Sequence, residues 1–219
     1  MHNTVKNLIY IEDLIKSKVN DEIRDKLIKI IAVSKTFPIE NILPLIEHGH
    51  LHYGENKVQE ALDKWTEIKI KNNNIKLHLI GKLQTNKVKF ALKIFDYIHS
   101  LDSEKLATKI ANEQVKQDKK LKIFIQINIG GEGQKSGVPK ERLGDFYKYC
   151  KNLNLDVIGT MCIPPNDQNP ENYFSEMNKI NQDINFKELS MGMSGDYLSA
   201  VKNNATYVRI GSKIFGNRD

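Results

Sequence analysis

Short apolar runs alternate with amphipathic segments along this chain, which is the pattern of strands followed by helices. The run from Ile30 to Val33 is apolar and rich in β-branched residues, as in a strand that is buried on both faces. Residues 3–26 instead place apolar side chains at helical spacing, on a stripe that includes Val5, Leu8 and Ile15. The chain therefore predicts a succession of buried strands joined by helices.

Eight strands are predicted in this way. Seven of them cover residues 28–34, 50–53, 75–80, 97–99, 121–127, 155–160 and 206–210, and a short one ends at Leu189. The expected helices cover residues 3–26 with a break near Val19–Asn20, then 39–47, 57–68, 86–93, 103–117, 139–150, 172–183 and 194–202. Ser103 is the expected N-cap of its helix.

Strict alternation of strand and helix favours a parallel sheet, and eight such strands favour a closed (β/α)8 TIM barrel over an open doubly wound sheet. The N-terminal helix is expected to cover the gap in the outer ring of helices. The length of 219 residues lies within the range of such barrels, and no Pro/Ser-rich linker divides the chain. We therefore expect a single α/β domain over residues 1–219.

Composition and charge bear on whether the protein binds nucleic acid or small anionic ligands. Hydrophobic residues make up 40% of the chain and charged residues 27%, as in globular proteins. The formal net charge of +6 raises the question of nucleic acid, but acidic and basic residues are interleaved without a block of five like charges. We expect mixed, solvated helix faces and no nucleic-acid partner, while small anionic ligands remain compatible with the positive surplus. Nucleic-acid binding is kept as an alternative hypothesis because of the net charge, and an affinity for RNA or DNA that falls with salt would support it.

The two cysteines, Cys150 and Cys162, fit a reducing compartment and provide neither a disulfide framework nor a paired metal motif. Charged residues interrupt any signal-peptide pattern near the N-terminus, and no apolar stretch is long enough to span a bilayer. We expect a cytoplasmic protein without a membrane partner, in which both cysteines are buried as small apolar side chains.

Lys35 is the first candidate for chemistry, because it lies two residues beyond the run that ends at Val33 and shortly before Pro38. In parallel α/β proteins, ligands and catalytic groups gather at the carboxyl ends of strands. Partial burial there disfavours the ammonium form of a lysine and makes its amine a nucleophile. The alternative is an ordinary solvated lysine in a loop.

Other polar and small residues follow the expected strands at the same end. Asn56 follows the second strand, Met161 follows the sixth, and the segments 190–195 and 209–212 follow the seventh and eighth. In barrels, the loops after the last two strands frequently bind phosphate, and Gly192, Gly195 and Gly211 would let backbone amides approach it. Ser194 is also a candidate helix cap. A plain helix cap and a tight turn are the alternative reading.

Two apparent motifs fail on spacing. The segment 130–137 resembles a nucleotide-binding P-loop, but Gln134 precedes Lys135 and the spacing from Gly130 is one residue short. His48, His50 and His52 look like metal ligands but have no carboxylate or cysteine partner at suitable spacing, so no metal site is expected.

Together, the motifs resemble the YggS/PROSC family of pyridoxal phosphate homeostasis proteins. The matching segments are Val33–Thr36, His52–Asn56, His78–Lys87, Gln126–Asn128 with Lys135–Gly137, Gly159–Met161, Leu189–Ser194 and Val208–Ser212. Small departures occur where Lys82 replaces a usual proline, Thr85 a usual serine and Gly195 a common acidic residue. The resemblance implies a single barrel like the N-terminal domain of alanine racemase, a fold type III pyridoxal phosphate protein.

The resemblance also implies the cofactor and its contacts. Lys35 would form an internal aldimine with the aldehyde of pyridoxal 5'-phosphate (PLP), and Arg209 would face the pyridine nitrogen. The remaining implied contacts are Ser194, Gly211 and Ser212 with nearby Ser190 around the phosphate, and Asn56, His78 and Met161 around the ring.

Arg209 disfavours transamination and decarboxylation of amino acids. A guanidinium has donors and no acceptor, so it favours an unprotonated pyridine nitrogen and weakens PLP as an electron sink. We expect a non-catalytic protein that carries and buffers PLP as a Schiff base for vitamin B6 homeostasis, affecting amino-acid and keto-acid metabolism. Apo PLP-dependent enzymes would be its recipients, and a monomer is expected. A PLP-dependent amino-acid racemase is the alternative, although the chain offers no second domain to bring a second base.

Overall fold

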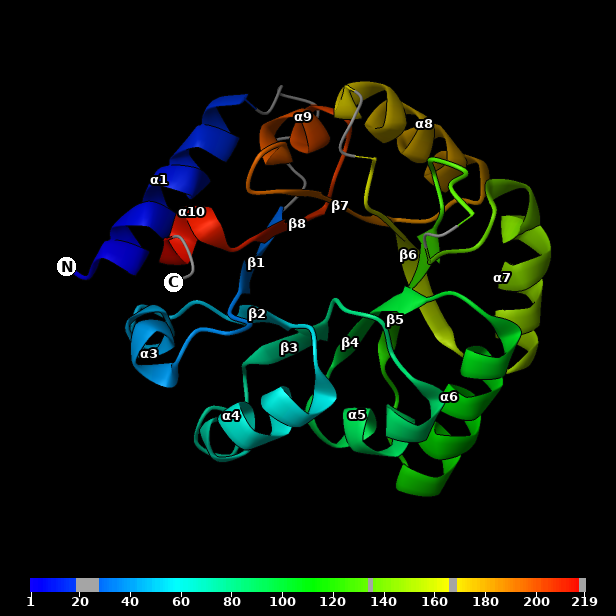
Figure 1. Ribbon diagram of the computed structural model, residues 1–219, viewed down its shortest axis with the longest axis horizontal. Helices are drawn as coiled ribbons and strands as arrows, with labels where there is room; N and C mark the ends of the chain where they lie inside the picture. The colour runs from blue at the N-terminus through cyan, green and yellow to red at the C-terminus, as the bar shows by residue number, and fades with distance from the viewer. Residues whose placement is uncertain (19–27, 134–135, 166–168, 217–219) are drawn as a thin grey trace.

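The strands of the computed structural model, which describes residues 1–18, 28–133, 136–165 and 169–216, form a closed parallel barrel (Figure 1). They are β1 (Lys29–Val33), β2 (His52–Glu55), β3 (Lys76–Leu79), β4 (Tyr97–Leu101), β5 (Lys122–Ile127), β6 (Asp156–Cys162), β7 (Glu188–Met193) and β8 (Tyr207–Ile210). Each strand pairs with its neighbour in sequence, and β8 pairs with β1 to close the ring. The predicted TIM barrel is confirmed.

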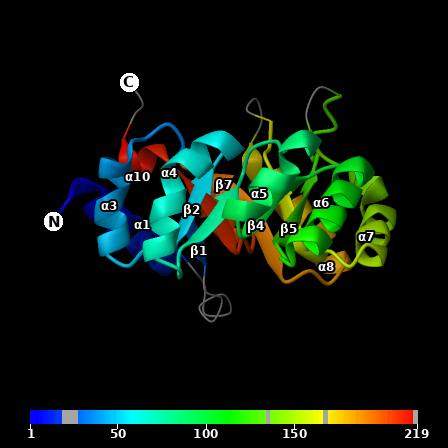
Figure 2. The same ribbon diagram turned by 90° about the horizontal axis from the view of Figure 1, so that it is seen from below.

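Helices surround the strands on the outside of the barrel (Figures 1 and 2). They are α1 (Asn3–Lys18), α3 (Ile39–Glu47), α4 (Val58–Lys71), α5 (Val88–Ile94), α6 (Glu104–Gln117), α7 (Leu143–Asn152), α8 (Pro170–Asp183), α9 (Tyr197–Lys202) and α10 (Ser212–Phe215). Short 3-10 turns at Thr85–Lys87 and Lys140–Arg142 precede α5 and α7. Among the described helices, none combines the length and the apolar character that crossing a membrane requires.

The helix α1 covers the gap in the ring, as predicted. It contacts α3, α9 and α10, and Figures 1 and 2 show it on the outside of the barrel, near the paired first and last strands. Its stripe of Val5, Leu8, Ile11 and Ile15 is buried against these neighbours. The second part of the expected helix and its break near Val19–Asn20 lie outside the described residues, as do Gln134 and Lys135.

The hydrophobic side chains form two layers because successive residues of a strand face opposite sides of the sheet. The larger layer lies between the strands and the helices, and it includes Ile30 and Ala32 of β1. The smaller layer fills the barrel and consists of Ile31, Tyr97, Phe124, Met161 and Tyr207. TIM barrels are usually filled by branched aliphatic residues, so this interior is unusually rich in rings.

Several expected strands, among them the second and the seventh, end before the strands of the structure do. The second was expected to end at Tyr53, but β2 continues through Gly54 and Glu55. A Cβ atom on Gly54 would lie 2.8 Å from the Ile31 side chain, so glycine here serves close packing inside the barrel rather than a turn. The seventh was expected to end at Leu189, but β7 extends to Met193 and pairs at Ser190 with Tyr207 of β8.

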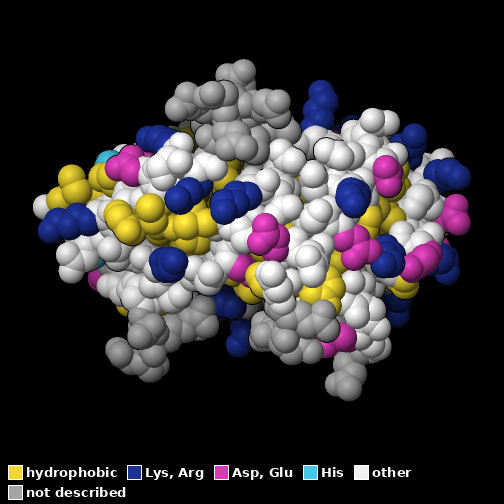
Figure 3. Space-filling model, turned by 90° about the horizontal axis from the view of Figure 1, so that it is seen from above, with side chains coloured by type: hydrophobic (Ala, Val, Ile, Leu, Met, Phe, Trp, Pro, Cys, Tyr) yellow, Lys and Arg dark blue, Asp and Glu magenta, His cyan; other side chains and the backbone are white. Residues whose placement is uncertain are grey.

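Charged side chains are mixed over the face seen in Figure 3. Lysine and arginine lie among aspartate and glutamate there, and hydrophobic side chains gather on the side that carries α1. The predicted interleaving of the two charge types is therefore visible on this face.

The packing of α1 predicts a specific loss of stability. Ile11 is 2% exposed, so the Ile11→Ala variant should lower the free energy of unfolding by roughly 3 kcal/mol, measured by urea denaturation. The control is Tyr10→Ala on the same helix, where the side chain is 65% exposed and a change below about 1 kcal/mol is expected. Equal losses in the two variants would contradict the described packing.

Candidate functional site

The pairing of β1 with β8 brings candidate site residues from the beginning and the end of the chain close together. Ile31 lies beside Arg209 and Ala32 beside Ile210, so the residues after both strands emerge at the same end of the barrel. Gly211 lies against Val33, since a Cβ atom on it would come within 3.4 Å of the Val33 side chain.

Lys35 lies at this carboxyl end in a turn directly after β1, as predicted, and its side chain is partly buried. Along β1, Lys29 lies over the ring of Tyr207 at 4.5 Å and Ile31 belongs to the interior cluster. Lys35 lies two residues beyond Val33, the last residue of this strand.

The turn that carries Lys35 is strained and held from one side. Thr36 has a φ of 68°, which is rare for a β-branched residue. Its backbone N–H donates a hydrogen bond of 2.6 Å to Glu60 Oε1 on α4. Although burial acts to raise the pKa of Glu60, the hydrogen bonds from Thr36 and Lys64 lower it overall. An ionised Glu60 therefore fixes the backbone next to Lys35.

A buried ion pair holds the other side of the turn. Ser34 Oγ donates to Glu55 Oε1 at 2.8 Å, and Trp65 Nε1 donates to the same oxygen at 3.0 Å. Lys64 Nζ lies 3.0 Å from Glu55 Oε1 and 3.1 Å from Glu60 Oε1, and it donates to the Ser34 carbonyl at 2.9 Å. We call Ser34, Glu55, Glu60 and Lys64 the turn clamp.

The loops after β7 and β8 also meet. The Gly211 N–H donates to Ser194 Oγ at 3.2 Å, and Ser212 is the exposed first residue of α10. Ser194 was expected to cap a helix from residue 194, but α9 begins at Tyr197 with Asp196 at the N-cap, so that prediction is wrong. The hydroxyl of Ser194 is instead directed to the end of β8.

Arg209 is a buried cation, 4% exposed, whose guanidinium is held at two points. Nη1 donates to Ser190 Oγ at 2.8 Å, and Nη2 donates to the Cys162 carbonyl at 2.9 Å. Burial lowers the pKa of Arg209, although an arginine remains a cation and a pure donor. Ser190 was expected near an anion in the loop after the seventh strand; it instead lies inside β7, fully buried and engaged with Arg209.

The three residues expected around a ring occupy different depths. Asn56 follows β2 as predicted, and Gly81 packs so closely on its backbone that a Cβ atom would lie 2.5 Å from the Asn56 carbonyl oxygen. Met161 was expected after the sixth strand but belongs to β6, within the barrel interior. His78 is fully buried in the middle of β3.

Sequence reasoning missed two parts of this region. One is the turn clamp, whose members are distant in sequence from Lys35 except for Ser34. The other is His99, which is fully buried on β4 and hydrogen-bonds through Nδ1 to Ser190 Oγ at 2.9 Å. Its signal was a histidine at the third position of an apolar strand, the same position that His78 occupies in β3.

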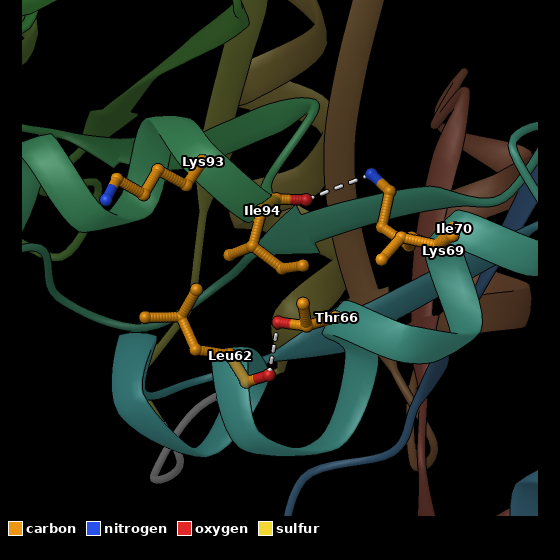
Figure 4. Close-up of a pocket in the computed structure, with 6 residues that line it drawn as sticks. All are labelled: Leu62, Thr66, Lys69, Ile70, Lys93 and Ile94. Carbon is orange, nitrogen blue, oxygen red and sulfur yellow. Dashed lines mark hydrogen bonds between the residues drawn. The ribbon is translucent and has the colours of Figure 1, made fainter.

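The outer surface carries a separate pocket of about 310 Å³ between α4 and α5 (Figure 4). Its lining residues are Leu62, Thr66, Lys69, Ile70, Lys93 and Ile94, none of which was a predicted site residue. Over the part of the chain that the structure describes, no three His, Cys, Asp or Glu side chains converge to hold a metal ion.

Comparison with known proteins gives a consistent result. The family model described as alanine racemase, N-terminal domain, matches residues 17–219. Pyridoxal phosphate homeostasis proteins of Aquifex aeolicus and Pasteurella multocida are 39% and 37% identical to the chain, which covers 87% and 97% of their lengths and aligns over 87% and 98% of its own.

Solved structures agree with this comparison. PipY of Synechococcus elongatus, determined with PLP bound, is 28% identical with a TM-score of 0.85, over 97% of this chain and 100% of that one. An alanine racemase of Clostridium difficile is 15% identical with a TM-score of 0.73, over 99% of this chain and 57% of that one. The latter likeness concerns the fold alone.

The turn clamp predicts that replacing Lys64 strongly lowers the stability of the protein. Glu55 is fully buried and Lys64 is 11% exposed at its side chain, so Lys64→Met would leave a buried carboxylate without its cation. We expect a loss of about 3 kcal/mol in the free energy of unfolding, measured by urea denaturation. Lys71→Met, at an exposed position of the same helix, is the control and should change little.

Two partly buried histidines predict acid sensitivity. Burial lowers the pKa of His50 and of His52 to about 4 each, whereas an unfolded histidine has a pKa of about 6.5. Between these values the unfolded chain binds more protons, so stability falls as the pH falls. From pH 7 to pH 5 each group should remove on the order of 2 kcal/mol, measured by urea midpoints.

The matched variants are His50→Gln and His48→Gln. The first should reduce the loss between pH 7 and pH 5, because it removes one of the proton-binding groups. The second changes an exposed neighbour and should leave the loss nearly unchanged. A pH response that is identical in both variants would contradict the role of burial.

Proposed function

Because this chain belongs to the pyridoxal phosphate homeostasis proteins, a family built on the alanine racemase N-terminal domain, we propose that it binds PLP and holds it as a Schiff base for release. It acts as a carrier and buffer of PLP in vitamin B6 homeostasis. Its recipients are apo PLP-dependent enzymes, so its loss would affect amino-acid and keto-acid metabolism. We also propose that it works as a cytoplasmic monomer.

The observation that carries this proposal is the meeting of a lysine, an anion-compatible loop pair and a buried arginine at one end of the barrel. PLP supplies an aldehyde that attaches reversibly to a primary amine. Lys35 is the amine in our assignment, and the turn clamp holds its backbone, which supports a fixed position for Nζ.

The donor set beside Lys35 fits the phosphate of PLP. Gly211 approaches β1 closely, and its amide nitrogen lies 3.2 Å from Ser194 Oγ. Ser212 is the first residue of α10. We assign these three residues to the phosphate. Ser190 is assigned elsewhere, because its hydroxyl is already engaged with Arg209 at 2.8 Å.

The remaining assignments concern the ring. Arg209 faces the pyridine nitrogen in our proposal and can only donate, so the nitrogen stays unprotonated and electron withdrawal by the ring is weak. Asn56 and Met161 line the ring. His78 is fully buried in the interior of the barrel, so we assign it to the packing beneath the ring rather than to direct contact.

A carrier is favoured over a racemase for two reasons. The donor-only partner of the ring disfavours formation of a carbanion, which racemisation needs. In addition, the two relatives that the chain matches at 39% and 37% identity are named as homeostasis proteins.

Retention of PLP by lysine variants tests the proposal. The Lys35→Ala variant should lose the visible absorbance of bound PLP and should release the cofactor during gel filtration. Lys82→Ala removes an exposed lysine from the loop after β3 and should retain PLP like the unchanged protein. Undiminished binding by Lys35→Ala, or none by either the variants or the parent chain, would contradict the assignment.

Exchange of the α-hydrogen separates the two functions. Alanine or serine in deuterated solvent should exchange no faster with the loaded protein than with free PLP. Exchange well above the free cofactor, abolished in Lys35→Ala, would favour the racemase.

A further inference from the structure

A line of three imidazole rings runs through the barrel and ends at Arg209. His52 Nδ1 lies 2.9 Å from His78 Nε2, and His78 Nδ1 lies 2.9 Å from His99 Nε2. His99 Nδ1 lies 2.9 Å from Ser190 Oγ, which accepts from Arg209 Nη1 at 2.8 Å. We call His52, His78, His99 and Ser190 the histidine relay.

The relay crosses the barrel from one end towards the other. His52 is the first residue of β2 and is partly exposed, whereas His78, His99 and Ser190 are fully buried. The ring of His78 stacks on Tyr97 with centroids 4.2 Å apart, and His99 stacks on Phe124 at 4.3 Å. Among the described residues, the buried His78 ring is hydrogen-bonded to His52 and His99, and the His99 ring to His78 and Ser190, so each nitrogen must be matched with its neighbour.

The protonation state of the rings follows from their burial. Desolvation holds the pKa of His78 and of His99 well below the usual value, and for His99 the charge of Arg209 acts in the same direction. Both rings are therefore neutral near pH 7, with one nitrogen donating and the other accepting.

Arg209 fixes the direction of every hydrogen bond in the relay. A guanidinium only donates, so Ser190 Oγ accepts from it, and the single Ser190 proton is free to donate to His99 Nδ1. His99 then carries its proton on Nε2 and donates to His78 Nδ1. By the same logic, His78 donates from Nε2 to His52 Nδ1.

The opposite direction leaves one group unmatched. If His99 Nδ1 donated to Ser190, the Ser190 oxygen would accept twice and its own proton would need another acceptor. Within the part of the chain that the structure describes, His99 and Arg209 are the hydrogen-bonding partners of this oxygen. A buried hydroxyl proton without an acceptor would cost free energy, so the direction away from Arg209 is favoured.

We propose that the histidine relay positions Arg209, by holding the Ser190 oxygen as a fixed acceptor and thereby aiming the rest of the guanidinium at the cofactor ring. The Cys162 carbonyl holds Nη2 at 2.9 Å, so the relay supplies the second of two anchors. His99 and His78 are positioning residues, because they act through Ser190. This inference rests on the proposed PLP site.

The first test needs no cofactor. A two-bond proton–nitrogen correlation spectrum of the unloaded protein, labelled with nitrogen-15 in histidine, reports which nitrogen of each ring carries the proton. We expect His52, His78 and His99 to carry it on Nε2 at pH 7, whereas exposed His48 serves as a solvent-averaged reference. A proton on Nδ1 of His99 or His78 would overturn the relay, whether or not the protein binds PLP.

The second test separates positioning from packing. His99→Phe keeps an aromatic ring against Phe124 but removes both nitrogens, and we expect about tenfold faster loss of PLP. His99→Asn places an oxygen near the position of Nδ1, so it can still accept from Ser190 and should restore retention to within about threefold of the parent. Equal loss in the two variants, or better retention with phenylalanine, would contradict a role through Ser190.

Discussion

The parallel pairing of β1 with β8 is the constraint on which the rest of this structure depends. It brings Ile31 beside Arg209, so the turn after the first strand and the loop after the last one open at the same end. Val33 and Gly211 are far apart in sequence, and only closure of the barrel makes them neighbours. The helix α1 secures this seam from outside through its contacts with α3, α9 and α10.

Two buried charged side chains, Arg209 and Glu55, are hydrogen-bonded to partners on the barrel strands and on the surrounding segments. Arg209 lies inside the barrel with Ser190 and the Cys162 carbonyl as acceptors, while Glu55 lies outside the strands with Lys64, Ser34 and Trp65 as donors. Burying a charge costs several kcal/mol unless its partners are well placed, so both groups depend on these hydrogen bonds. Arg209 provides hydrogen-bond donors inside the barrel, and Glu55 helps to hold the turn that carries Lys35.

The sequence predicted the order of strands and helices because period-two and helical patterns depend on local spacing. It also placed Lys35 and Asn56 correctly, since both follow apolar strands. It failed at Gly54 and Ser190, small residues that usually mark turns but lie inside strands here. Gly54 leaves space for the Ile31 side chain, and the Ser190 hydroxyl binds Arg209 and His99. The histidine relay and the turn clamp were out of reach, because their members come from different strands and helices and meet only when the barrel closes.

Reduction of the loaded protein with borohydride, followed by peptide mapping, tests the central claim most directly. Reduction makes the link between PLP and its lysine permanent, so the modified peptide identifies the amine. The account predicts a pyridoxyl group on Lys35 alone, with loss of the visible absorbance on reduction. A label spread over several exposed lysines, or concentrated on a lysine other than Lys35, would contradict it.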